Sequence, residues 1–134
     1  MREIIFRGKR IDNGEWVEGY LLMSEWTDGV YIITQDECNH NAGGSYFDGH
    51  IDEVIPETVG QYTGKKDMTG VKIFEHDVIT NLYEDDYVCF WDECNYEFGI
   101  KNDQYDCSLA MASRYITVVG NIHDNPEFLG GIEE

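Results

Sequence analysis

The residues best suited to bind a metal ion lie between positions 36 and 50. Cys38 and His40 follow two acidic residues, and His50 comes ten positions later. A tetrahedral zinc site takes four nitrogen or sulfur ligands, commonly from two closely spaced pairs. The sequence contains no C-x₂-C pair. The spacing therefore favours a polar loop with an incidental thiol, and we assign no metal ligand and no cofactor.

Other reactive side chains also lack the spacing that chemistry requires. The acidic run Glu84-Asp85-Asp86 is contiguous, whereas a calcium loop alternates its ligands. No serine lies in a G-x-S-x-G elbow, and Gly43-Gly44 is not followed by the Lys-Ser/Thr of a phosphate loop. Cys89 and Cys107 lie in apolar surroundings typical of buried structural thiols. We therefore predict no catalytic residue and a protein that is not an enzyme.

Charge restricts the partners of this chain. Its 134 residues include 27 acidic and 9 basic ones, giving a formal charge of −18. Such a chain lacks the Lys and Arg that neutralise phosphates, which argues against direct contact with nucleic acid or with an anionic membrane. The first ten residues carry four bases and one acid, whereas residues 11–60 carry eleven acids and no base.

The length predicts one domain with, at most, a second small lobe. No signal peptide and no run of about 20 apolar residues is visible. We expect a cytoplasmic protein with reduced thiols.

Turn residues indicate a β protein. Asn13-Gly14 separates residues 3–11 from 15–23, and Asp28-Gly29 precedes a strand over 30–34. Asn-Gly suits both positive-φ positions of a type I′ turn, so a three-stranded antiparallel meander is predicted. Tyr20-Leu21-Leu22 is apolar on both faces. We expect this sheet to be covered on both sides, by the rest of the chain or by another subunit of a homo-oligomer.

The remainder of the chain predicts a second group of strands. A polar loop over residues 35–49 leads to a strand over 50–55, which Pro56 ends. Residues 57–63 are expected to be irregular and 65–70 to form a turn. Strands are then expected over 71–74, 77–81, 87–91, 96–100 and 114–119, with one-turn helices within 107–113 and after Pro126. The fold class is mainly β, with a meander lobe over 1–55 and a second lobe over 56–134.

Three segments resemble a known family. They are REIIFRGK (2–9) with GEWVEGYL (14–21), IPETVGQYTG (55–64) with Lys66-Asp67 and IFEHDVI (73–79), and VVGNIHDNPE (118–127). In this order they resemble the YopX family of phage and mobile-element proteins. The resemblance implies an SH3-like β-barrel in the second lobe, a phage or prophage origin in a bacterial host, and no established biochemical activity.

The residues that carry the resemblance are interpreted as fold determinants rather than ligand contacts. They are Pro56, Glu57, Thr58, Gly60, Gln61, Tyr62, Thr63, Gly64, Asp67, Glu75, Asp77, Gly120, Asn121, Asn125 and Pro126. His76 departs from the pattern, because the family usually has Gly between the Glu and the Asp. If that position has a positive φ, His76 adopts a strained turn or the turn is remodelled.

These observations predict a non-enzymatic phage accessory protein that acts through protein–protein contact, with the partner unknown. Exposed aromatic residues on an acidic surface would suit such an interface. One alternative is an acidic decoy that mimics nucleic acid and occupies a host DNA- or RNA-binding protein. Another is a metal-binding enzyme.

Overall fold

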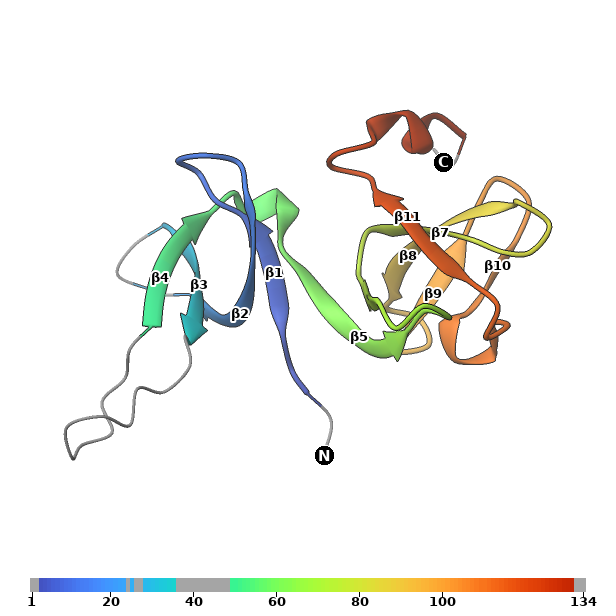
Figure 1. The fold of residues 1–134 in the computed structure, drawn as a ribbon, viewed down its shortest axis with the longest axis horizontal. Helices are drawn as coiled ribbons and strands as arrows, with labels where there is room; N and C mark the ends of the chain where they lie inside the picture. Colours follow the sequence, from blue (N-terminus) through green and yellow to red (C-terminus); the bar gives the residue numbers. More distant parts are fainter. Residues whose placement is uncertain (1–2, 24, 26–27, 36–48, 132–134) are drawn as a thin grey trace. The chain divides into compact units, whose positions relative to one another are not determined.

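The computed structural model describes residues 3–23, 25, 28–35 and 49–131 (Figure 1). These residues form antiparallel β-strands joined by turns and short 3₁₀ helices, so the prediction of a mainly β protein is confirmed. The chain divides into two compact units, with Glu3–Gln61 in the first and Tyr62 beginning the second. The division falls inside strand β5 (Gly60–Lys66), a few residues after the expected position at Pro56.

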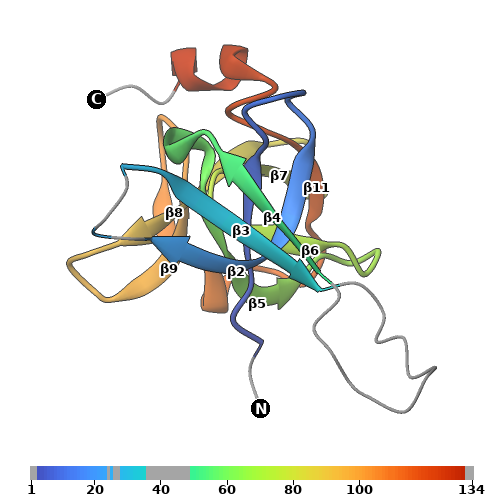
Figure 2. The same cartoon turned by 90° about the vertical axis from the view of Figure 1, so that its left-hand side faces the viewer.

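The first unit is a meander of four strands. They are β1 (Phe6–Lys9), β2 (Trp16–Met23), β3 (Val30–Gln35) and β4 (Gly49–Val54), followed by the 3₁₀ helix η1 (Pro56–Thr58). Each strand pairs with the next, and β3 lies between β2 and β4 (Figure 2). The start of β5 adds to the other edge, where Gly60 and Gln61 pair with Arg7 and Phe6. The predicted antiparallel meander is therefore confirmed.

The turn between β1 and β2 differs in type from the prediction. Gly14 has a φ of +73°, but Asn13 is not among the described residues with positive φ. Instead the Asn13 side chain accepts a hydrogen bond from the backbone N–H of Glu15 at 2.9 Å. The predicted type I′ geometry is wrong, because this side-chain bond stabilises a local turn with a single left-handed residue.

The two faces of the first sheet have different environments. Ile32 and Val54 are fully buried on the inner face. On the outer face Tyr20 pairs with Ile33, and Ile33 pairs with Ile51, so these side chains lie together across three strands. Tyr20 and Ile51 are 58% and 59% exposed. Within the first unit, the described residues thus do not supply the expected cover on this second face.

The second unit contains the end of β5 and six further strands. These are β6 (Lys72–Phe74), β7 (Asp77–Thr80), β8 (Asp86–Asp92), β9 (Glu97–Lys101), β10 (Asp106–Ser108) and β11 (Thr117–Asn121), with 3₁₀ helices η2 (Leu109–Met111) and η3 (Pro126–Gly131). Five of them form an open sheet in the order β10-β9-β8-β7-β11. No closed barrel forms within the described residues.

An apolar core supports this second sheet. Ile73, Ile79, Cys89, Ile100, Leu109 and Ile116 are buried together. The interpretation of Cys89 as a buried thiol is confirmed, whereas that of Cys107 is wrong, because Cys107 lies exposed on the outer strand β10. No helix in the described ranges has the length and apolar character needed to cross a membrane.

Two expectations of irregular structure are also wrong. Residues 60–66 form strand β5, although a loop and a turn were expected there. Residues 106–108 form β10, and the expected helical turn is confined to Leu109–Met111. In both places pairing with distant strands determines the backbone, which the local composition does not reveal.

Candidate functional site

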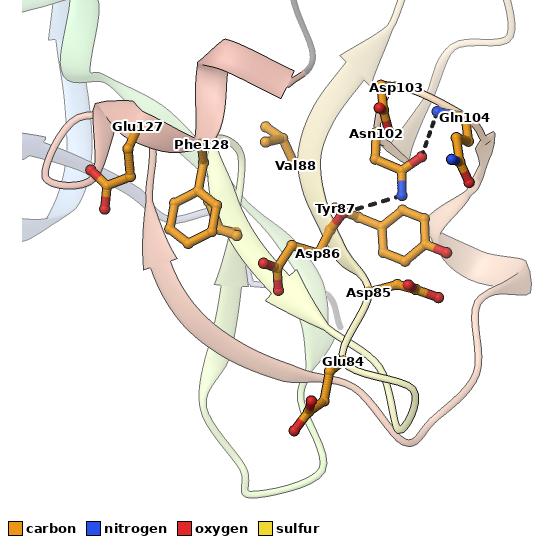
Figure 3. Close-up of a pocket in the computed structure, with 11 residues that line it drawn as sticks. Glu84, Asp85, Asp86, Tyr87, Val88, Asn102, Asp103, Gln104, Glu127 and Phe128 are labelled. Carbon is orange, nitrogen blue, oxygen red and sulfur yellow. Dashed lines mark hydrogen bonds between the residues drawn. The ribbon is translucent and has the colours of Figure 1, made fainter.

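The second unit contains an open hollow of about 350 Å³ that we call the acidic hollow. It is lined by residues of β7, β8, the turn before β8, the loop after β9, and η3 (Figure 3). The lining residues are Val78, Glu84, Asp85, Asp86, Tyr87, Val88, Asn102, Asp103, Gln104, Glu127 and Phe128. Figure 3 shows Glu127 and Phe128 on one side and Asn102, Asp103 and Gln104 on the other.

Negative charge dominates the hollow. Its five carboxylates are those of Glu84, Asp85, Asp86, Asp103 and Glu127, all of which are solvent-exposed. No lysine, arginine or histidine is among the lining residues. The apolar part comes from the buried Val78 and Val88 and from the half-buried rings of Tyr87 and Phe128.

The acidic turn is positioned by Asn81. Its side-chain oxygen accepts hydrogen bonds from the backbone N–H groups of Tyr83 at 2.9 Å and Asp85 at 3.0 Å. Glu84 takes the left-handed conformation, with a φ of 63°. This arrangement reverses the chain between β7 and β8 and directs consecutive carboxylates to the same turn.

The facing loop is positioned by Asn102 in the same way. Its side-chain oxygen accepts from the backbone N–H groups of Gln104 at 2.9 Å and Tyr105 at 2.8 Å. Its amide group donates to the backbone carbonyl of Asp86 at 3.3 Å. Asn102 thus connects the two acidic segments directly.

Tyr87 stays protonated in this environment. Burial and the neighbouring charge of Asp85 raise the pKa of Tyr87 above its ordinary value. The hydroxyl is therefore a neutral hydrogen-bond donor and acceptor near pH 7. Carboxylates beside aromatic rings attract cations, and an Arg or Lys side chain satisfies both kinds of group.

A second hollow, of about 360 Å³, lies beside β5, β9 and η2. Lys65 lines it, but the ammonium group of this residue donates to the backbone carbonyls of Leu109 at 3.0 Å and Ala112 at 3.3 Å. The ammonium group of Lys65 thus stabilises the backbone around η2, and we do not treat this hollow as a candidate site.

The residues of the family resemblance lie at turns and strand ends. Pro56, Glu57 and Thr58 form η1; Gly60, Gln61, Tyr62, Thr63 and Gly64 lie in β5; Asp67 follows β5; Glu75 and Asp77 flank the β6–β7 turn; Gly120 and Asn121 end β11; and Asn125 and Pro126 lead into η3. None of them is among the residues that line the acidic hollow.

Several of these residues bond to the backbone, either within a turn or at a distant segment. The Thr58 hydroxyl accepts from the Lys9 N–H at 2.9 Å and donates to the Ile55 carbonyl. The buried Asp77 carboxylate accepts from the Phe74 N–H at 2.7 Å, across the turn between β6 and β7.

The Asp67 carboxylate accepts four hydrogen bonds. One oxygen accepts from the hydroxyl and N–H of Thr69 and the N–H of Val71, and the other accepts from the N–H of Val118 at 2.9 Å. Burial favours the neutral acid, but these hydrogen bonds outweigh it and keep the pKa of Asp67 below its ordinary value.

Asn121 organises the segment after β11. Its side-chain oxygen accepts from the N–H groups of His123 at 3.0 Å and Asp124 at 2.9 Å. Its own N–H donates to the Asn125 side chain at 3.2 Å. The Asn125 side chain therefore bonds back to β11.

The conditional prediction for His76 is confirmed on the backbone. Its φ is 77°, which lies in the left-handed region that glycine tolerates best. The histidine thus occupies the turn in the strained conformation.

The metal-binding candidates of the sequence cannot be placed together. Cys38, His40 and the loop around them lie outside the described residues. In the part of the chain that the structure describes, no group of three or more His, Cys, Asp or Glu side chains is arranged to hold a metal ion.

Sequence reasoning did not identify the acidic hollow. It singled out Glu84-Asp85-Asp86 but not Asp103, Gln104, Glu127 or Phe128, which lie far away in the chain. The available signal was a pair of Asn residues, Asn81 and Asn102, each followed two positions later by the residue whose N–H it binds. Such Asx turns predict that the chain reverses at each place, but not that the two turns lie beside each other in the fold.

The fold resembles a solved structure. The crystal structure of protein EF1440 from Enterococcus faecalis aligns with a TM-score of 0.57 and 21% identity, covering 96% of this chain and 99% of that chain. At this identity the likeness shows the fold alone. No curated protein matches the sequence significantly.

The sequence itself matches a family model. The model described as YopX protein aligns with residues 5–130, which include all of the second and third segments of the resemblance and all but residues 2–4 of the first. The chain belongs to the YopX family.

Proposed function

We propose that this protein is a non-enzymatic accessory protein of a phage or prophage that acts by protein–protein contact in the cytoplasm of its bacterial host. The acidic hollow is the observation that supports this function. Its five carboxylates, with no basic residue among the lining residues, complement a basic side chain of a partner protein. The rings of Tyr87 and Phe128 add an apolar surface for the aliphatic part of Lys or Arg.

A pair of charge-matched variants tests this site. In one, Asp86, Asp103 and Glu127 are changed to Asn, Asn and Gln. In the other, the exposed residues Glu3, Glu93 and Asp106, none of which lines the hollow, are changed to Gln, Gln and Asn. Both remove three charges, so any difference between them reports position rather than net charge.

Binding of an arginine-rich peptide is then measured at physiological salt. We expect the first variant to lose at least about tenfold in affinity, the equivalent of one to two charge-assisted hydrogen bonds, while the second stays within about twofold of the unmodified protein. Equal losses of affinity in the two variants would show that the whole acidic surface attracts the peptide, and would contradict a specific binding site in the acidic hollow. Host proteins captured by the second variant but not by the first would identify the partner.

A decoy of nucleic acid is the second candidate function. The excess of acidic residues favours it, since a mimic must present carboxylates at about the spacing of one charge per 1.7 Å of duplex. Part of that charge is neutralised locally, because Arg10 pairs with Asp12 at 2.8 Å and with Asp52 at 3.5 Å. A competition assay with duplex DNA distinguishes the two functions. A decoy and the DNA exclude each other from the partner, whereas with an ordinary protein contact the partner binds both at once.

The SH3-like barrel of the family resemblance is likewise a proposal for the second unit. Its support is the connectivity, since β7 to β10 follow in order, η2 joins β10 to β11, and β11 returns to pair with β7. This order brings the last strand beside the first of the five.

We also propose that the protein forms a homo-oligomer through the outer face of the first sheet. Tyr20, Leu22 and Ile51 are exposed there. Arg7 and Lys9 lie on β1 at one end of this face and Glu53 lies on β4 at the other. A two-fold axis would place the basic strand of one copy near the acidic strand of the other.

A further inference from the structure

Two imidazole rings meet in the second unit, away from the acidic hollow. His76 lies in the turn between β6 and β7, and His123 follows β11. The Nδ1 atom of His76 and the Nε2 atom of His123 are 3.2 Å apart. The rings are nearly perpendicular, at 86°, with centroids 5.0 Å apart.

The separation of the two nitrogens matches that of ligands on one metal ion. Zinc binds imidazole nitrogen at about 2.0–2.1 Å with tetrahedral angles, so two such ligands stand roughly 3.3 Å apart. The observed 3.2 Å lies close to this value. To bind one ion, both rings would rotate so that their lone pairs point to a common metal position instead of to each other.

The backbone holds both histidines in place. The His76 N–H donates to the Cys89 carbonyl at 2.8 Å, and the His76 carbonyl accepts from the Ile122 N–H at 3.1 Å. The His123 N–H donates to the Asn121 side chain at 3.0 Å. The two side chains therefore project from segments that are hydrogen-bonded to each other, which limits the entropy lost on binding an ion.

A carboxylate also lies beside the outer nitrogen of His76. The Nε2 atom is 3.7 Å from the Glu75 carboxylate. A proton on Nε2 would be favoured by this charge, and that tautomer would leave the lone pair on Nδ1, the nitrogen that contacts His123. Metal-binding histidines commonly have such a carboxylate at their second nitrogen.

The strain at His76 is an independent indication. Its φ of 77° is unfavourable for a residue with a Cβ atom. Such strain concentrates at sites that clamp a ligand. A glycine would satisfy this turn without strain but would supply no imidazole.

We propose that His76 and His123 form a two-histidine site for a divalent transition-metal ion of the Zn²⁺ class, with water completing its coordination. Within the described residues no third His, Cys, Asp or Glu joins them as a ligand group, so the site is open and exchangeable. The ion links the β6–β7 turn to the segment after β11. This inference does not depend on the proposed function.

Zinc titration of single-site variants tests the proposal. The starting protein has Cys38, Cys94 and Cys107 changed to Ser, so that these thiols cannot supply a competing site. His76→Gly and His123→Gln are compared with His50→Gln, which removes an exposed histidine in the first unit. His76→Gly is expected to fold because glycine suits the positive φ.

Calorimetry and Co²⁺ absorption provide the readouts. We expect one Zn²⁺ per chain in the starting protein and in His50→Gln, and at least about tenfold weaker binding in His76→Gly and His123→Gln. Zinc should raise the melting temperature only of the proteins that bind it. The proposal would be overturned if the starting protein bound no Zn²⁺, or if loss of His76 or His123 left Zn²⁺ binding unchanged. The contact would then be only a hydrogen bond between the two rings.

Discussion

At the scale of single residues, the family pattern of this chain includes several side chains that bond to the backbone. Asp67 is the clearest case, because its carboxylate accepts hydrogen bonds from both the turn that follows it and from Val118 on β11. Thr58 and Asn121 serve the same purpose at other strand ends. These contacts give short polar residues a structural role at turns and strand ends.

The charge of Asp67 should contribute to stability. We expect Asp67→Asn to lower the free energy of unfolding by about 1–3 kcal/mol at pH 7, because an amide group cannot accept all four hydrogen bonds. The folded-state pKa of Asp67 is lowered. The stability that its charge contributes is therefore complete at pH values above the ordinary pKa of a carboxyl group, and it is lost as the pH falls through the folded-state pKa.

Urea unfolding of both proteins between pH 7 and pH 3 measures this effect. The difference between them should shrink below about pH 4, where the unfolded-state carboxyl takes up a proton. Asp106→Asn, which changes an exposed carboxylate, serves as the control. A difference that is independent of pH would contradict the role given to the charge.

At the scale of elements, the end of β11 depends on one close contact. The register between β11 and β7 shifts between Val118 and Gly120. A Cβ atom at Gly120 would overlap the side-chain oxygen of Asn125, which is bonded to the Asn121 N–H. The strand end and the following turn therefore require a residue without a side chain at this position.

Gly120→Ala should accordingly destabilise the protein. We expect a loss of about 1–3 kcal/mol, the usual cost of overpacking, measured by chemical unfolding. In the double variant with Asn125→Ala the clash is absent. Its loss of unfolding free energy should therefore be smaller than the sum of the losses in the two single variants, by at least about 0.5 kcal/mol. Additive effects would show that the backbone, not Asn125, resists the new methyl group.

Sequence reasoning recovered the elements whose signals are local. The strand pair around Gly14 and the strands that contain Ile79 and Ile100 follow from turn residues and apolar spacing. Tyr96 shows the limit, since it continues the alternation of Phe98 and Ile100 but lies outside β9 with a φ of 55° and 81% exposure. Its backbone is determined by the turn and not by the pattern.

The remaining differences come from contacts between distant segments. Strand β5 carries two glycines and two lysines, which locally suggest a turn, yet it pairs with β1 and β6. The acidic hollow likewise combines residues 84–86, 102–104 and 127–128. No spacing rule within one segment contains that information.

At the scale of the whole molecule, a chain with a charge of −18 associates with itself only where its surface is locally balanced. The outer face of the first sheet combines exposed apolar side chains with Arg7, Lys9 and Glu53. Long-range repulsion between copies falls as salt is added, while apolar contact persists. Self-association through this face should therefore strengthen with ionic strength.

Sedimentation velocity tests this expectation. We expect Tyr20→Lys to weaken self-association at least about tenfold, because it places a charge in the apolar part of the face. Tyr83→Lys makes the same chemical change at a residue that is 86% exposed in the second unit and should leave association unaltered. A protein that stays monomeric at all concentrations and salts, or equal effects of the two changes, would contradict the proposed face.

Strand β5 has a consequence for how this family can evolve. Its first residues complete the sheet of one unit and its last residues begin the other, so the boundary between the units runs through seven consecutive residues of one strand. Recombination usually exchanges segments at flexible linkers, where few contacts are cut. Here any crossover point would separate half a strand from its partners. We therefore expect the two units to be inherited together, and natural variation in length to accumulate in their loops.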